Sequence, residues 1–189
     1  MENKSELFEK LKSAAIRSGA KAAQVIPVLQ IKTDRIFRDI CKSNSCGGYG
    51  RCYMCPPDVG EIDALIEELG RYSHVLVYQT VTEIEDSYDY EGMVEAKKAT
   101  IPLAFALRGA AKELSLTDAL HLGSGGCGVC GVCAKRTGEP CRAPELALPS
   151  LEAYGVNVNE LAKSAGMKYV NGQNTVTYFG AVLFNVQED

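Results

Sequence analysis

The chain has 189 residues, and its 20 Lys and Arg against 24 Asp and Glu give a formal net charge of −4 at pH 7. With 46% hydrophobic and 23% charged residues the composition is that of a globular protein, which excludes intrinsic disorder. The chain lacks the basic excess that nucleic-acid binding needs and any run of 18 apolar residues, so we expect neither nucleic acid nor a membrane as a partner.

The first half of the chain predicts two helices and two strands. Apolar residues at helical spacing predict a helix over residues 5–18. Residues 22–31 read as a strand, in which Pro27 favours an edge position or a bulge because it lacks a backbone donor. A helix over residues 61–69 and a strand over 74–81 follow, the latter apolar enough to be buried on both faces. The order strand, helix, strand predicts a crossover unit.

The second half begins with a long helical pattern over residues 90–114, where Pro102 either kinks the helix or opens a second one. A brief strand is expected over 119–122. A helix is predicted over 157–165, opening on an Asn-x-x-Glu capping pair, and a closing strand or hairpin half over 176–186.

These elements predict one α/β (or α+β) domain over residues 1–189, with a mixed sheet flanked by helices. Two cysteine-rich loops interrupt it, at residues 41–57 and 123–144. Loops that leave the same edge of a sheet can meet, so we expect the two to lie close together. The amino terminus carries no apolar stretch that a secretion machinery reads, which predicts a cytoplasmic protein.

The eight cysteines fall into two groups of four within these loops. The first group has the spacing C-x4-C-x5-C-x2-C and the second C-x2-C-x2-C-x7-C. Four converging thiolates select zinc, copper(I) or an iron–sulfur cluster rather than calcium or magnesium. Successive C-x2-C steps among glycines suit a cubane, because the glycine backbone leaves N–H groups free to donate to sulfur. The candidate ligands are Cys41, Cys46, Cys52 and Cys55 in the first group and Cys127, Cys130, Cys133 and Cys141 in the second.

The same cysteines are open to other interpretations. Paired C-x2-C turns also build structural zinc sites, so zinc remains the alternative to iron–sulfur at either group, and one site of each kind is possible. Disulfides fit poorly, because a reducing compartment seldom tolerates them and a chain of this length does not need them.

The cysteine strings also carry a resemblance to a known family. The strings C-x4-C-G-x-Y-G-x4-C-P-P, G-x-C-x2-C-x2-C-x4-G-x-P-C-R-x-P and S-x-E-A-Y-G resemble a family of cysteine-rich predicted metal-binding proteins of anaerobic bacteria and archaea. The likeness covers about residues 41–158 and implies metal binding and iron–sulfur chemistry without naming a substrate. Seven cysteines occupy motif positions, while Cys52 lies outside the motif and is either an added ligand or a spare thiol.

Several other residues are candidates for roles near the thiolates. Arg51, Arg136 and Arg142 flank the cysteines, where they either compensate the negative charge of a cluster or are simply solvated. For Tyr49 we expect ordinary packing rather than contact with a substrate.

The two histidines and an acidic run are assigned to structure rather than chemistry. His74 and His121 each lack a second His at ligand spacing, so we expect them to be structural. The acidic residues between 83 and 91 are expected to be solvated, with docking of a basic redox partner as the other interpretation.

The function expected from these residues is iron–sulfur redox, with one or two 4Fe-4S clusters that either pass electrons to a partner protein or activate a small-molecule substrate. The alternative is a zinc-stabilised interaction module. The number of ligands at the first group separates carrier from enzyme, because a cubane held by three cysteines leaves one iron open.

Overall fold

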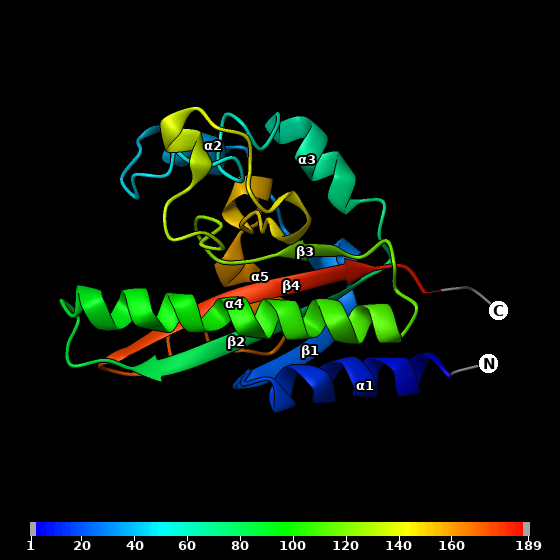
Figure 1. Cartoon of the computed structure of the whole chain (residues 1–189). Coiled ribbons are helices and arrows are strands. Elements are labelled where there is room, and N and C mark those ends of the chain that lie inside the picture. Colours follow the sequence, from blue (N-terminus) through cyan, green and yellow to red (C-terminus); the bar gives the residue numbers. More distant parts are fainter. Residues whose placement is uncertain (1–2, 187–189) are drawn as a thin grey trace.

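The protein is a three-layer α+β structure, shown as a computed structural model that describes residues 3–186 (Figure 1). Its middle layer is a four-stranded sheet in the order β1-β2-β4-β3, and every pair of named strands runs antiparallel. The strands are β1 (Ala22–Pro27), β2 (His74–Glu83), β3 (Leu120–Leu122) and β4 (Thr175–Phe184).

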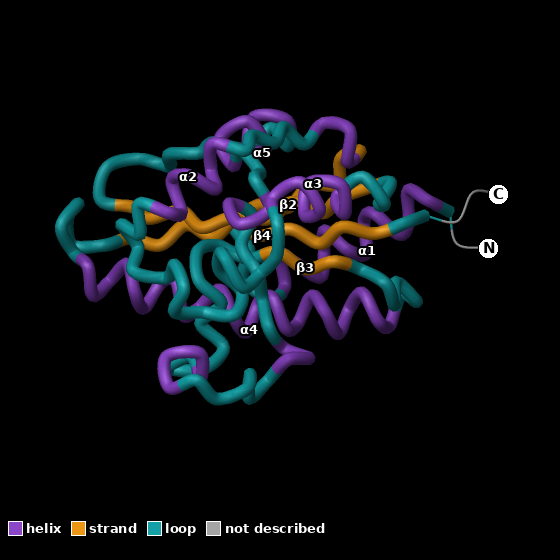
Figure 2. The backbone as a smooth tube through the Cα atoms, turned by 90° about the horizontal axis from the view of Figure 1, so that it is seen from above, coloured by secondary structure: helices purple, strands orange, loops and turns teal. Residues whose placement is uncertain are grey.

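Helices cover both faces of the sheet (Figure 2). One face carries α1 (Lys4–Arg17) and α4 (Tyr90–Glu113). The other carries α2 (Ile36–Lys42), α3 (Ile62–Leu69) and α5 (Val158–Ser164). The two cysteine-rich loops lie together beyond the β3 edge of the sheet, at the top of Figure 1. The α+β form of the predicted fold is therefore confirmed, with an antiparallel sheet in place of the expected mixed one.

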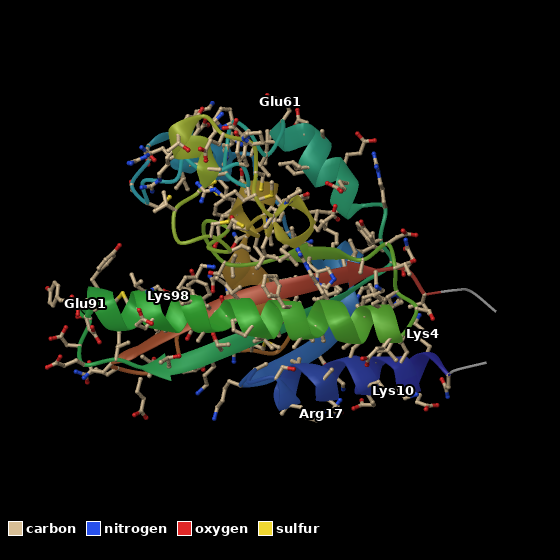
Figure 3. All side chains as sticks on the ribbon, viewed as in Figure 1. Lys4, Lys10, Arg17, Glu61, Glu91 and Lys98 are labelled. Carbon is tan, nitrogen blue, oxygen red and sulfur yellow. The ribbon has the colours of Figure 1, made fainter. Side chains whose placement is uncertain are left out.

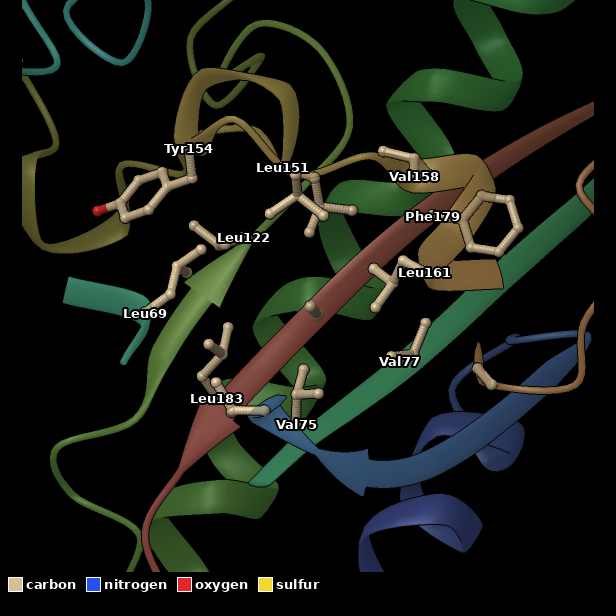
Figure 4. Packing of buried hydrophobic residues seen from close by; sticks show 14 of the residues in the cluster. Leu69, Val75, Val77, Leu122, Leu151, Tyr154, Val158, Leu161, Phe179 and Leu183 are labelled. Atoms are coloured by element: carbon tan, nitrogen blue, oxygen red, sulfur yellow. The ribbon is translucent and has the colours of Figure 1, made fainter. Parts of the chain in front are cut away.

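Side chains of the central strand β2 alternate between two separate cores. Val75 and Val77 point into the layer that contains α3 and α5, where they join Leu161 and Leu183 (Figure 4). Their neighbour Leu76 points the other way, into the core that α1 and α4 form. Because adjacent residues of a strand face opposite sides, both cores share one sheet. The prediction that this strand is buried on both faces is confirmed.

The predicted crossover between the first two strands is wrong. Pro27 pairs with His74, so the chain leaves β1 and re-enters β2 at the same end of the sheet, and the two strands run antiparallel. The eight residues of α3 span about 12 Å, whereas the ten residues of β2 span about 33 Å. The helix is therefore too short to carry the chain back along the sheet, as a parallel crossover requires.

The other predicted elements match the structure closely, with two differences at prolines, whereas α2 has no counterpart among the predicted elements. The first strand ends at Pro27 and continues as a short 3₁₀ turn, and β1 is an edge strand, as its proline favours. Helix α4 continues through Pro102 as one element. Pro102 is exposed, so the carbonyl that loses its intrahelical donor lies on the solvent side and can bind water. The capping pair is confirmed, since the Asn157 side chain accepts from the backbone N–H of Glu160 at 3.1 Å.

Within residues 3–186, none of the helices has the length and apolar character needed to cross a lipid bilayer.

Candidate metal centre

The two cysteine loops are held against each other by contacts between residues far apart in the sequence. The Tyr53 hydroxyl donates to the backbone carbonyl of Glu139 at 2.7 Å. Lys135 forms an ion pair with Asp58, and its ammonium group lies 5.3 Å from the centre of the Tyr53 ring. The loops therefore meet, as expected, although the first is reached from β1 at the far edge of the sheet through a segment that crosses one face.

The four cysteines of the second loop surround one small cavity, and Cys52 of the first loop lines the same cavity. The wall is completed by apolar and backbone groups, among them Met54 and Ala147. Cys52 is only 9% exposed. The thiols that line the cavity are Cys52, Cys127, Cys130, Cys133 and Cys141.

Backbone N–H groups are aimed at the sulfurs of this cavity. The N–H of Leu148 lies 3.3 Å from the Cys127 sulfur. The Cys52 sulfur accepts hydrogen bonds from the Cys55 thiol and from the backbone N–H of Cys127 and Met54, and these bonds lower the pKa of Cys52. Donors of this kind stabilise thiolates and the sulfur ligands of metal centres.

The remaining cysteines of the first loop, Cys41, Cys46 and Cys55, lie near one another, and the latter two lie beside Gly48. A Cβ atom at residue 48 would lie 3.2 Å from the Cys55 sulfur and 3.6 Å from the Cys46 sulfur, so a glycine lets both thiols approach this turn. The hydrogen bond to Cys52 raises the pKa of Cys55, as do burial and the charges of Cys46 and Cys41. Cys41, Cys46 and Cys55 therefore interact electrostatically, and Cys52 connects this group to the cavity of the second loop.

The thiols lie in two adjacent loops, but their sulfur atoms do not converge on a single metal position. In the described part of the chain, no three side chains among His, Cys, Asp and Glu are placed so that they could grip one ion. Cys52 and Cys55 form a hydrogen bond through a thiol proton. A metal that binds these sulfurs would displace that proton. The donor set nonetheless fits a soft metal or an iron–sulfur cluster, because eight free thiols and inward N–H groups converge on two adjacent loops.

Buried charges next to the thiols come from residues that the sequence analysis did not single out. Arg38 on α2 is 8% exposed, and one of its nitrogens, Nη1, donates to the Gly60 carbonyl at 2.8 Å. Its other two nitrogens, Nε and Nη2, are buried and have no hydrogen-bond partner within residues 3–186. Burial raises the pKa of Cys41, and the Arg38 charge opposes that rise. Arg38 therefore places a positive charge close enough to Cys41 to oppose this rise in its pKa, and two of its donor nitrogens remain unused among the described residues.

Two further charged groups lie between the loops and the helices beneath them. Glu152, in the S-x-E-A-Y-G string, has a buried carboxylate oxygen with no hydrogen-bond partner in the described part of the chain. Its negative charge raises the pKa of both Cys41 and Lys97. Burial lowers the pKa of Lys97, while the charges of Cys127, Glu152 and Cys55 raise it. The interior of the site is therefore polar, and the cations Arg38 and Lys97 lie close enough to the thiols to interact electrostatically with them.

A third cation, Arg108 on α4, supports the second loop from below. Its guanidinium donates to the carbonyls of Glu145 and Ala147 at 2.9 and 2.7 Å, and its charge reaches Cys127. These bonds fix the segment whose next residue, Leu148, donates to Cys127. Figure 3 shows sulfur atoms, in yellow, in the region of the two loops.

The three arginines expected near the cysteines, Arg51, Arg136 and Arg142, do not direct their guanidinium groups to the thiols. Arg51 and Arg136 are exposed. Arg142 lines the five-thiol cavity but directs its guanidinium to the Val132 carbonyl at 3.3 Å and to Glu139 at 3.2 Å. Only Arg38 had a signal in the sequence, since it lies one helical turn before Cys41; Lys97 and Arg108 are brought in by tertiary folding.

The remaining candidates have structural positions. The His74 ring packs 5.0 Å from Phe8 and 6.1 Å from Phe184, in agreement with a structural role. His121 on β3 is largely buried beside Arg108, and burial with that charge lowers its pKa to about 4. Tyr49 is half-buried, and its backbone N–H donates to the Asn44 side chain at 3.0 Å.

Part of the acidic run builds the turn before α4. The Asp89 carboxylate accepts from the backbone N–H of Gly92 at 2.7 Å and of Glu85 at 3.0 Å, which caps the helix. Asp86 accepts from the N–H of Tyr88 at 2.7 Å. Docking of a basic partner at this run stays a prediction.

Comparison with known proteins gives one match. The model of a family described as "Predicted metal-binding protein (DUF2284)" matches residues 24–184. Neither the curated proteins nor the solved structures include a match.

Proposed function

Because the chain belongs to this family of predicted metal-binding proteins, we propose that its cysteine loops hold iron–sulfur clusters of the 4Fe-4S type, which serve redox chemistry. The observation that carries the proposal is the cavity lined by five thiols, three of them from successive C-x2-C steps. Such a cluster supplies one-electron transfer when bound.

The residues of the second loop have the roles of ligands and of donors around them. Cys127, Cys130, Cys133 and Cys141 would hold the cluster, since all four line one cavity. The backbone N–H of Leu148, fixed through Arg108, would donate to the Cys127 sulfur and stabilise its negative charge.

The first loop offers three neighbouring thiols, namely Cys41, Cys46 and Cys55. If these three hold a second cluster, one of its irons lacks a cysteine ligand and is open to a small molecule or to Cys52. This count favours activation of a substrate over simple electron storage at the first loop, because full four-cysteine ligation usually serves electron transfer alone. Arg38 would then compensate the charge of the thiolates from the protein side.

Anaerobic purification tests the proposal directly. We expect visible absorption at about 400 nm that bleaches with dithionite, together with iron and acid-labile sulfide in the protein. A colourless protein that contains zinc and no iron would contradict the proposal and establish the zinc-stabilised module instead.

The variant Cys130→Ser examines the ligand assignment at the second loop. It should lose the metal of that loop and destabilise it, because metal binding contributes directly to folding. Val132→Ala, an exposed change in the same loop, serves as the matched control and should keep the wild-type metal content. Retention of all the metal in Cys130→Ser would refute the assignment.

A further inference from the structure

A second hollow in the molecule adjoins the cysteine site but contains no cysteine. This groove has a volume of about 540 Å³ and lies between the carboxyl-terminal part of α4, strand β3 and the segment 145–149. Sites for small molecules usually measure about 300–1,000 Å³, so the groove is of the right size. Its size distinguishes it from the narrow cavity between the thiols.

The groove holds more positive charge than its neighbours neutralise. Arg108 and Lys112 lie one helical turn apart on α4 and both line it, as does Glu145. Arg108 donates to two neutral carbonyls, and neither cation forms an ion pair with a carboxylate among the described residues. Two cations against one carboxylate leave an excess of one positive charge.

The other walls of the groove suit an organic ligand with an apolar body. Leu116 and Leu120 line one side, and His121 adds a ring that can accept or donate a hydrogen bond. With a pKa near 4, His121 is uncharged at neutral pH, so it does not add to the positive excess. A single excess charge matches a monoanion better than a phosphate dianion.

The groove and the cysteine cavity share a wall. Ala147 lines both hollows, and the next residue, Leu148, donates to the Cys127 sulfur. A molecule in the groove would therefore be separated from the second group of cysteines by a single stretch of chain. This closeness distinguishes the groove from an ordinary surface hollow.

We propose that this groove binds a small organic monocarboxylate, with its carboxylate between Lys112, Arg108 and His121 and its apolar part against Leu116 and Leu120. The carboxylate would replace water around the two cations, and the apolar body would be removed from water against the leucines. Because no cysteine lines the groove, a ligand can bind there whether or not the cysteines hold a metal.

Binding of benzoate to the whole protein, followed by ligand-observed NMR titration, tests the proposal. Benzoate should bind saturably and at least tenfold more tightly than benzamide, its neutral analogue of the same shape. It should also bind at least tenfold more tightly than inorganic phosphate. Equal affinity for benzoate and benzamide would overturn the role of charge, and tighter binding of phosphate would overturn the ligand class.

Two variants place the site. Lys112→Ala should weaken benzoate binding about tenfold or more, since Lys112 is exposed and its removal leaves the fold intact. Lys98→Ala removes one charge from an exposed site elsewhere on α4 and should change the affinity less than twofold. Thr117→Trp places an indole in the groove and should abolish binding. Wild-type affinity in both Lys112→Ala and Thr117→Trp would place benzoate elsewhere and overturn the proposal.

A metal-free preparation separates this proposal from the proposed function. Benzoate should still bind to protein stripped of metal, because the groove is built from α4, β3 and the segment 145–149. Absence of an iron–sulfur cluster from the purified protein would contradict the proposed function but not the groove proposal. Failure of benzoate to bind would contradict the groove proposal but not the assignment of the cysteines.

Discussion

Cys52 is the residue on which the division of ligands between the two loops depends. In the sequence it belongs to the first group, but in the structure it lines the cavity of the second. It is hydrogen-bonded to Cys55 on one side and to the N–H of Cys127 on the other. A thiol in this position can complete either centre or bridge them, so its removal reports how many cysteines each centre needs.

We expect Cys52→Ser to keep the metal of the first loop, because the thiols of Cys41, Cys46 and Cys55 remain there. Cys55→Ser should lose that metal, since it removes one of the three thiols that we assign to the first centre. Metal and sulfide analysis of the two variants, prepared anaerobically in parallel, gives the comparison. Equal losses in both would mean that Cys52 is a required ligand of the first centre.

Residue-level reasoning on the sequence identified the thiols but not the charges around them. The spacing of the cysteines was informative because C-x2-C steps are local and need no knowledge of the fold. Lys97 and Glu152 are 55 residues apart in sequence and meet only after the chain folds. No local pattern reports such a meeting.

Helix α2 shows at the scale of an element why part of the site escapes prediction. It is seven residues long, which is too short for a helical period to stand out. Its apolar residues Ile36 and Ile40 are about half exposed, while its charged Arg38 is buried. An element that buries a charge and exposes its apolar residues reverses the usual pattern. Here the buried Arg38 donates to the Gly60 carbonyl, and its charge acts on the Cys41 thiol.

The short helix places Arg38 and Cys41 one turn apart, which gives it a testable role. Arg38→Met should weaken binding of cobalt(II), used as a probe on metal-free protein, by about 10- to 100-fold at the first loop. The cause is that the thiolates lose a neighbouring positive charge. Arg38→Lys should recover part of the affinity, and Arg35→Met, an exposed change just before the same helix, should have none of this effect. Unchanged cobalt affinity in Arg38→Met would remove Arg38 from the site.

Longer elements were predictable because their apolar faces follow the secondary structure. Helix α1 and strand β2 were located nearly to the residue. What the sequence could not give was the direction of neighbouring strands. The segment between β1 and β2 has a helix in it, as a crossover would, and only the tertiary path shows that the chain returns to the end from which it left.

At the scale of the whole molecule, one sheet joins the two helical layers that cover its faces. Leu161 on α5 and Leu11 on α1 are fully buried in the two separate cores. Both cores use side chains of the same strands β2 and β4. We therefore expect the layers to unfold together, in accordance with the single domain predicted from the sequence.

Leu11→Ala and Leu161→Ala test this expectation. Each should lower the free energy of unfolding by about 2–5 kcal/mol, because each leaves a cavity in a packed core. Denaturation of the metal-free protein, followed by circular dichroism and by tyrosine fluorescence, should give one coincident transition in both variants. Two separated transitions, with only one shifted in each variant, would show that the layers fold independently.

The segment from Glu145 to Leu148 has one side turned to the groove and the other to the cysteines. Arg108, which holds it in place, is itself part of the groove. A carboxylate that binds Arg108 would therefore change the position of Leu148 and of the Cys127 sulfur to which it donates. By thermodynamic linkage the effect is reciprocal: the factor by which a bound metal changes the affinity for the carboxylate equals the factor by which the carboxylate changes the affinity for the metal.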